Sequence, residues 1–101
     1  MVATIHSIDL IATNPKSRGG RPCIAGTTVE VSVIVIAKIV HGQSPDEIAA
    51  DYRLMLAQVY AALAYYYEHK AEMDTSIRER YKLAQEMKEK RVGSRHSSLP
   101  G

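Results

Sequence analysis

The stretch SPDE at residues 44–47 most constrains the fold, because it has the form of a helix start. Ser44 is a good N-cap residue, and Pro45 suits the first helical position, where its missing N–H costs nothing. Glu47 stands three residues after Ser44 and completes a capping box. We therefore predict a short helix over residues 45–52, with Ile48, Ala49 and Tyr52 facing inward, followed by a turn at RLM (53–55).

Two further helices are predicted around this one. In LAQVYAALAYYYEHK (56–70), Val59, Leu63 and Tyr66 recur at the spacing of one helix face. With the turn and the capped helix, this segment has the layout of a helix-turn-helix. Upstream, SVIVIAKIVHG (32–42) is apolar nearly all round and ends at a glycine, which is typical of a helix C-terminus. Its β-branched residues also permit a strand, but its length favours a buried helix.

The N-terminal third contains three short strand candidates: SIDLIAT (7–13), PCIA (22–25) and TVEV (28–31). Gly26 and Thr27 separate the last two, a spacing that suggests a tight hairpin or a bent crossover. The glycine-rich GGRPCIAGT stretch is not a phosphate-binding loop, because no Gly-Lys-Ser/Thr follows it.

The C-terminal third predicts a charged helix and a tail. Residues 71–91 are charged except for a narrow apolar stripe, and residues 92–101 are small and polar, as in a disordered tail. We predict a mainly α fold: a small N-terminal β-hairpin and a tri-helical, winged-helix-like or helix-turn-helix core within residues 1–70, then this C-terminal helix. The stripe consists of Met73, Ile77, Tyr81, Ala84 and Met87.

Residue types argue against an enzyme. The one cysteine, Cys23, cannot form an internal disulfide, and the four histidines are scattered, so neither a nucleophile–base pair nor a closed zinc site is indicated. We expect Cys23 to be a small buried hydrophobe, and we expect no metal and no cofactor. The N-terminus lacks a signal-peptide pattern, and the longest apolar run, at 33–37, is too short to span a membrane, so we expect a cytosolic protein.

Nucleic-acid binding receives limited support. The net charge is +2, without a strongly basic segment. In a helix-turn-helix the second helix enters the major groove, where Gln58 could pair with adenine, next to Tyr60. Because residues 54–69 hold no Lys or Arg, phosphate contacts would come from Arg53 and Arg21, with Lys16, Arg18 and a dimer mate.

Tyrosines suggest an interface with a partner or a second copy. Residues 65–67 are consecutive tyrosines, which point round most of a helical turn, so Tyr65 and Tyr67 would be exposed while Tyr66 is buried. We predict a homodimer or partner interface formed by Tyr65, Tyr67, Ile77 and Tyr81.

Residues 8–73 resemble the bacterial domain-of-unknown-function 433 family, which is grouped with helix-turn-helix proteins and VapB-like antitoxins. The order of the shared motifs is kept, with three departures: Asn14 stands where an aspartate is frequent, Thr28 where an arginine is usual, and Met55 where a Thr or Ser often caps the helix. The matching residues are Asn14-Pro15, GRPCIAGT (20–27), Val31, Gly42, SPDEI (44–48), DYRL (51–54), LAQV (56–59) and ALAYYYEH (62–69).

The resemblance implies an antitoxin that neutralises a PIN-like ribonuclease and represses its own operon as a dimer. The C-terminal helix would bind the nuclease, and one of its cations could enter the acidic metal-binding pocket. The candidates are Arg78, Arg80, Lys82 and Lys88. The alternative is a DNA-binding transcriptional regulator without a toxin.

Overall fold

The computed structural model describes residue 3 and residues 8–16 and 18–98, with side chains as far as Lys90 except that of Arg18. The chain divides into two units, Met1–His69 and Lys70–Gly101, which we describe separately. The structure is mainly helical with one small antiparallel sheet near the N-terminus. This confirms the predicted mainly α fold with an N-terminal hairpin and a C-terminal helix.

The sheet joins β1 (Ile11–Ala12) to β2 (Cys23–Ile24), with Ile11 opposite Ile24 and Ala12 opposite Cys23. The connecting loop contains a short 3-10 turn, η1 (Arg18–Gly20). The pairing of β1 with β2 was not predicted. The expected antiparallel approach of 22–25 and 28–31 across Gly26 is also present, since the Ile24 N–H donates to the Val29 carbonyl at 2.9 Å and the Val31 N–H to the Pro22 carbonyl at 3.0 Å. Residues 28–31 contribute a single bridge, between Glu30 and Cys23, because Val31 already begins the first helix.

The predicted helix at 32–42 is present as α1 (Val31–Val35) and a π-helical turn, η2 (Ile36–Val40). Gly42 follows with a φ of 66°, the left-handed conformation expected at the end of a helix. Most of α1 is buried, as predicted, but Ile39 and Val40 at the end of η2 are exposed. α1 packs against the long third helix, whereas η2 meets the short second helix.

The predicted capping box is confirmed at the start of α2 (Pro45–Tyr52). The Ser44 hydroxyl accepts the Glu47 N–H at 3.2 Å, and the Glu47 carboxylate accepts the Ser44 N–H at 2.9 Å. Ile48 is buried, but Tyr52 is exposed rather than inward-facing. The helix ends at Arg53, which has a φ of 54°, and α3 (Leu56–Glu68) begins after a short turn.

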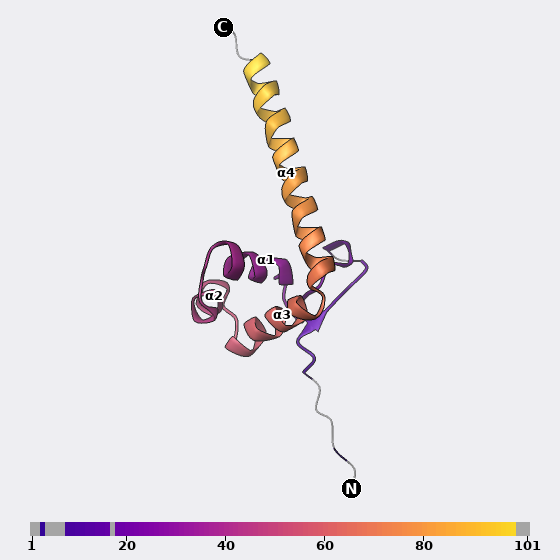
Figure 1. Ribbon diagram of the computed structural model, residues 1–101, viewed down its shortest axis with the longest axis vertical. Coiled ribbons are helices and arrows are strands. Elements are labelled where there is room, and N and C mark those ends of the chain that lie inside the picture. Colours follow the sequence, from indigo (N-terminus) through magenta and orange to yellow (C-terminus); the bar gives the residue numbers. More distant parts are fainter. Residues whose placement is uncertain (1–2, 4–7, 17, 99–101) are drawn as a thin grey trace. The chain divides into compact units, whose positions relative to one another are not determined.

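The core of the first unit lies where α1, α2, α3 and β2 meet (Figure 1). The predicted inward face of α3 is confirmed, since Val59, Ala62, Leu63 and Tyr66 are all buried. Because phenylalanine and tryptophan are absent, aliphatic side chains fill this core. Its fully buried larger side chains are Ile24, Val31, Ile34, Ile48 and Val59.

The second unit is the long helix α4 (Lys70–Ser98). His69, with φ −123° and ψ 35°, separates it from α3. The helix extends beyond the predicted 71–91, so residues 92–98 of the expected tail are helical, and 99–101 lie outside the described residues. The helices that the structure describes are each too short or too polar to cross a bilayer.

Candidate functional site

The side chain of Gln58, the residue expected to read adenine, accepts a backbone hydrogen bond at the N-terminus of α3. Its Oε1 accepts the Met55 N–H at 2.7 Å, while Met55 itself provides no side-chain cap. Bidentate pairing with adenine uses both the amide oxygen and the amide nitrogen. Base reading by Gln58 would therefore compete with this cap.

Arg21 is held by an ion pair. Its Nε donates to Glu30 Oε1 at 2.7 Å and its Nη2 to Oε2 at 3.4 Å. Glu30 is only 8% exposed and sits at the N-cap position of α1, and its carboxylate raises the pKa of Arg21. The pair ties the hairpin loop to the start of α1. Arg21 thus has a structural role, which competes with the predicted phosphate contact.

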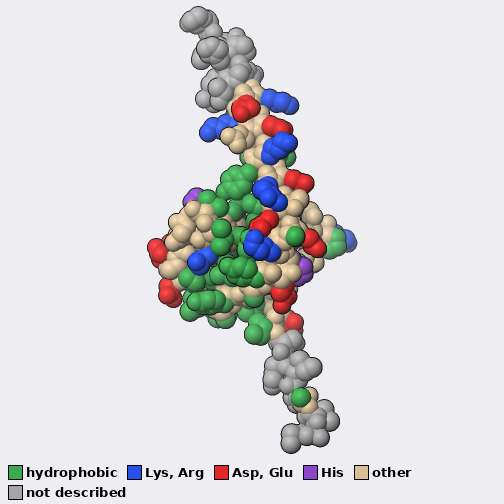
Figure 2. Space-filling view, in the orientation of Figure 1, with side chains coloured by type: hydrophobic (Ala, Val, Ile, Leu, Met, Phe, Trp, Pro, Cys, Tyr) green, Lys and Arg blue, Asp and Glu red, His purple; other side chains and the backbone are tan. Residues whose placement is uncertain are grey.

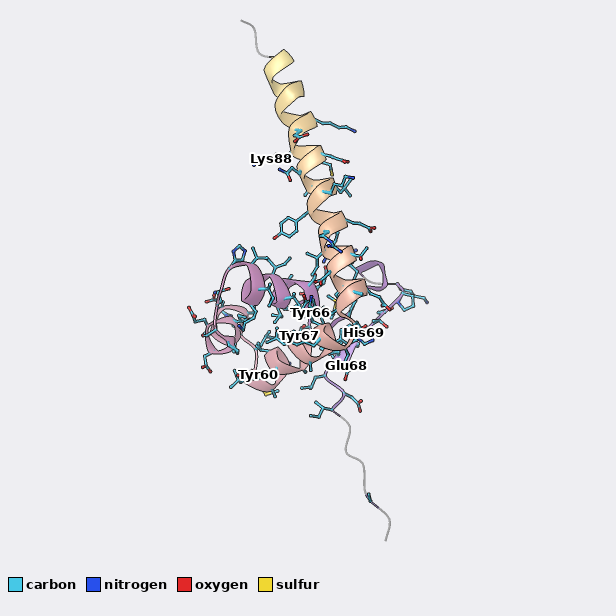
Figure 3. The ribbon with its side chains drawn as sticks, in the orientation of Figure 1. Tyr60, Tyr66, Tyr67, Glu68, His69 and Lys88 are labelled. Carbon is cyan, nitrogen blue, oxygen red and sulfur yellow. The ribbon has the colours of Figure 1, made fainter. Side chains whose placement is uncertain are left out.

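The remaining predicted DNA contacts of the first unit are exposed. Arg53 lies in the turn between α2 and α3, and Tyr60 is 55% exposed near the start of α3 (Figure 3). Lys16 is exposed in the hairpin loop. The side chain of Arg18 lies outside the described residues.

An apolar groove of about 630 Å³ lies between the segment leading into β1 and one face of α3. Ala57, Ala61 and Ala64 line it with Tyr60, and two acidic residues, Asp9 and Glu68, also line it. Figure 3 labels Tyr60 near the beginning of α3 and Glu68 at its end. Sequence reasoning missed this groove, although alanines at positions i, i+4 and i+7 mark a helix face that a close neighbour could approach. Its other lining residues are Ile8, Ile11 and Tyr65.

The three consecutive tyrosines are placed differently from one another. Tyr66 is buried as predicted, and Tyr67 is exposed. The predicted exposure of Tyr65 is wrong: it is half-buried, lines the groove, and stacks on His69 with ring centroids 4.2 Å apart. His69 Nδ1 also lies 3.0 Å from the Tyr65 carbonyl oxygen.

Figure 2 shows hydrophobic side chains gathered on one face of the first unit.

The four cationic residues predicted to bind the nuclease lie on different faces of α4. At about 100° of rotation per residue, Arg80 and Lys88 fall within the angular range of the apolar stripe, whereas Lys82 lies on the opposite face and Arg78 between the two faces. Within the stripe, Ile77 is half-buried, and Tyr81 and Met87 are exposed. Lys88 and Arg80 are therefore the candidates that could act together with the apolar side chains.

Cys23 borders a smaller hollow of about 230 Å³ next to the hairpin. It is half-buried rather than fully buried, and its Sγ lies 3.5 Å from the Arg21 carbonyl oxygen. In the part of the chain that the structure describes, no three His, Cys, Asp or Glu side chains gather as metal ligands would.

A comparison with protein families finds that residues 11–66 match the model described as "Protein of unknown function (DUF433)". No curated protein and no solved structure matches the chain. The matched residues run from β1 to near the end of α3, so they contain the hairpin, the core and part of the groove. All of α4 lies beyond them.

Proposed function

The chain belongs to the DUF433 family of proteins of unknown function, and we propose that it is an antitoxin-like binding module that neutralises a PIN-like ribonuclease. In this proposal the first unit supplies dimerisation, with DNA contacts for autorepression, and α4 supplies the contact with the nuclease.

One observation carries the proposal: α4 forms a unit of its own and presents apolar side chains to solvent. Every residue from 81 to 90 is exposed, including Tyr81, Leu83 and Met87. An amphipathic helix of this kind commonly binds by laying its apolar side in a groove of a partner. Lys88, which lies within the angular range of the stripe, would follow into the acidic pocket where such a nuclease holds its metal ions.

The predicted alternative is a DNA-binding regulator without a toxin. The exposed Arg53 and Tyr60 beside the α2–α3 turn favour it. The competing bonds of Gln58 and Arg21 count against it. We therefore rank it second.

The test uses the full chain and the nuclease encoded by a neighbouring PIN-like reading frame. Met87→Asp should weaken binding at least tenfold and release RNA cleavage, because it places a charge where an apolar contact is needed. Gln85→Asp is the matched control, since it adds the same charge to an exposed position on a different face of α4. Lys88→Gln should lower inhibition more than Lys82→Gln does.

If the Met87 and Gln85 variants inhibit the nuclease equally well, α4 does not form the contact. Absence of any binding by the wild-type chain would remove the antitoxin proposal and favour the regulator.

A further inference from the structure

The first unit has an open sheet edge at β1. Ile11 faces Ile24 across the sheet, and the Ala25 N–H donates to the Leu10 carbonyl at 2.8 Å. This register makes Ile11–Ile24 a non-hydrogen-bonded pair, in which the backbone groups of both residues point away from the partner strand. Ile24 confirms this geometry, because its N–H donates to the Val29 carbonyl at 2.9 Å on the far side of β2.

By the same alternation, the N–H and C=O groups of Asp9, Ile11 and Thr13 point to the outer edge of β1. Asp9 and Thr13 are exposed and Ile11 is half-buried. Within the described residues, no strand lies beyond this edge. A row of such groups is a template for another strand, and a two-stranded sheet is marginal on its own.

We propose that this edge pairs with β1 of a second copy of the chain, antiparallel about a two-fold axis at Ile11. The two hairpins then form one four-stranded sheet. The inference deepens the dimerisation that the proposed function assigns to the first unit and rests on that part of it, while its test needs neither a nuclease nor DNA.

Charge and backbone chemistry disfavour the two neighbouring registers that are centred on another edge-facing residue. Centring the pair on Ile11 sets Asp9 of each copy opposite Thr13 of the other, so a carboxylate faces a hydroxyl. Centring it on Asp9 would set two carboxylates opposite each other, which is destabilising. Centring it on Thr13 would bring Pro15, which has no N–H to donate, into the ladder. The Ile11 register thus gives three hydrogen-bonded pairs without a charge conflict.

The groove supports the same occupant. Ile11 and Asp9 line it together with α3, so this face of β1 is directed towards the α3 side of the sheet. Residues directly opposite each other in a sheet share a face. Ile11 of the second copy would therefore project beside the groove and cover part of its apolar lining.

The test is sedimentation velocity of the full chain over a concentration series. We expect a wild-type dimer. Thr13→Glu should weaken it about tenfold, because the two-fold axis creates two like-charge pairs per dimer. Thr13→Lys should preserve it, and the double variant Asp9→Lys with Thr13→Glu should recover it by reversing the pair. Thr28→Glu is the control, because it adds the same charge at another exposed loop position.

A second experiment measures whether the outward-pointing backbone groups of β1 become hydrogen-bonded in the dimer. Amide hydrogen exchange at Ile11 should slow as the protein concentration rises, since its N–H becomes bonded only in the dimer. A monomeric wild type at all concentrations overturns the proposal. So does a dimer that Thr13→Glu leaves intact, or one that Tyr67→Glu dissociates while Thr13→Glu does not, which would place the interface on the tyrosine face.

Discussion

At the scale of single residues, the ionised carboxylate of Glu47 stabilises the N-terminus of α2. Its carboxylate accepts the Ser44 N–H, and this bond, with the Ser44 hydroxyl contact, holds the pKa of Glu47 below its ordinary value. Both bonds span three residues, which is why the sequence alone predicted them. A group whose pKa is lowered in the folded state stabilises that state while it is ionised.

We therefore predict a pH dependence that Glu47→Gln removes. Above the ordinary glutamate pKa the wild type has its full stabilisation, which is lost as the pH falls through the lower folded pKa. Glutamine keeps an acceptor but does not titrate. Urea unfolding of both proteins at pH 7 and pH 3 should show that the wild type's advantage in unfolding free energy shrinks at low pH. If the difference in unfolding free energy between the wild type and Glu47→Gln is the same at pH 7 and pH 3, the ionised carboxylate of Glu47 is not the stabilising group.

At the scale of elements, the helices and the turn across Gly26 were predictable, and the pairing of β1 with β2 was not. Helix periodicity, the capping box and the glycine stop are local signals, and they placed α1, α2 and α3 within a few residues. The antiparallel approach across Gly26 follows from a local turn signal and is present, whereas the pairing of Ile11 with Ile24 spans a longer loop that no local pattern specifies. The extent of α4 was missed because its last residues are small and polar.

The start of α3 offers a prediction at this scale. Met55 is 63% exposed and gives the helix no side-chain cap, while Gln58 already supplies the reciprocal bond. Met55→Ser would complete the capping box and should raise the free energy of unfolding by ~1 kcal/mol. Met55→Ala is the matched control, because it removes the same side chain without adding an acceptor. Chemical denaturation measures both, and equal stabilities would mean that the serine does not cap.

At the scale of the molecule, the candidate surfaces depend on contacts that sequence reasoning could not place. The stripe on α4 follows from helix spacing, and Tyr66 was correctly assigned to the core. The groove needs the segment before β1 to lie along α3, and the half-buried position of Tyr65 follows from that arrangement. The bonds that engage Gln58 and Arg21 likewise became visible only in the folded chain.

The same distribution of charge predicts how the whole chain would bind DNA. With Arg21 paired to Glu30 and a net charge of +2, we expect few phosphate contacts, led by Arg53. For two or three such contacts, raising salt from about 50 to 200 mM should weaken binding to a promoter fragment about 10- to 40-fold. Arg53→Ala should lower the salt slope by about one per copy, whereas Arg53→Lys, which keeps the charge, should preserve it. Fluorescence anisotropy at several salt concentrations measures the slope. If the affinity ignores salt, or if Arg53→Ala leaves the slope unchanged, the α2–α3 turn does not contact the phosphate backbone and autorepression through this surface is wrong.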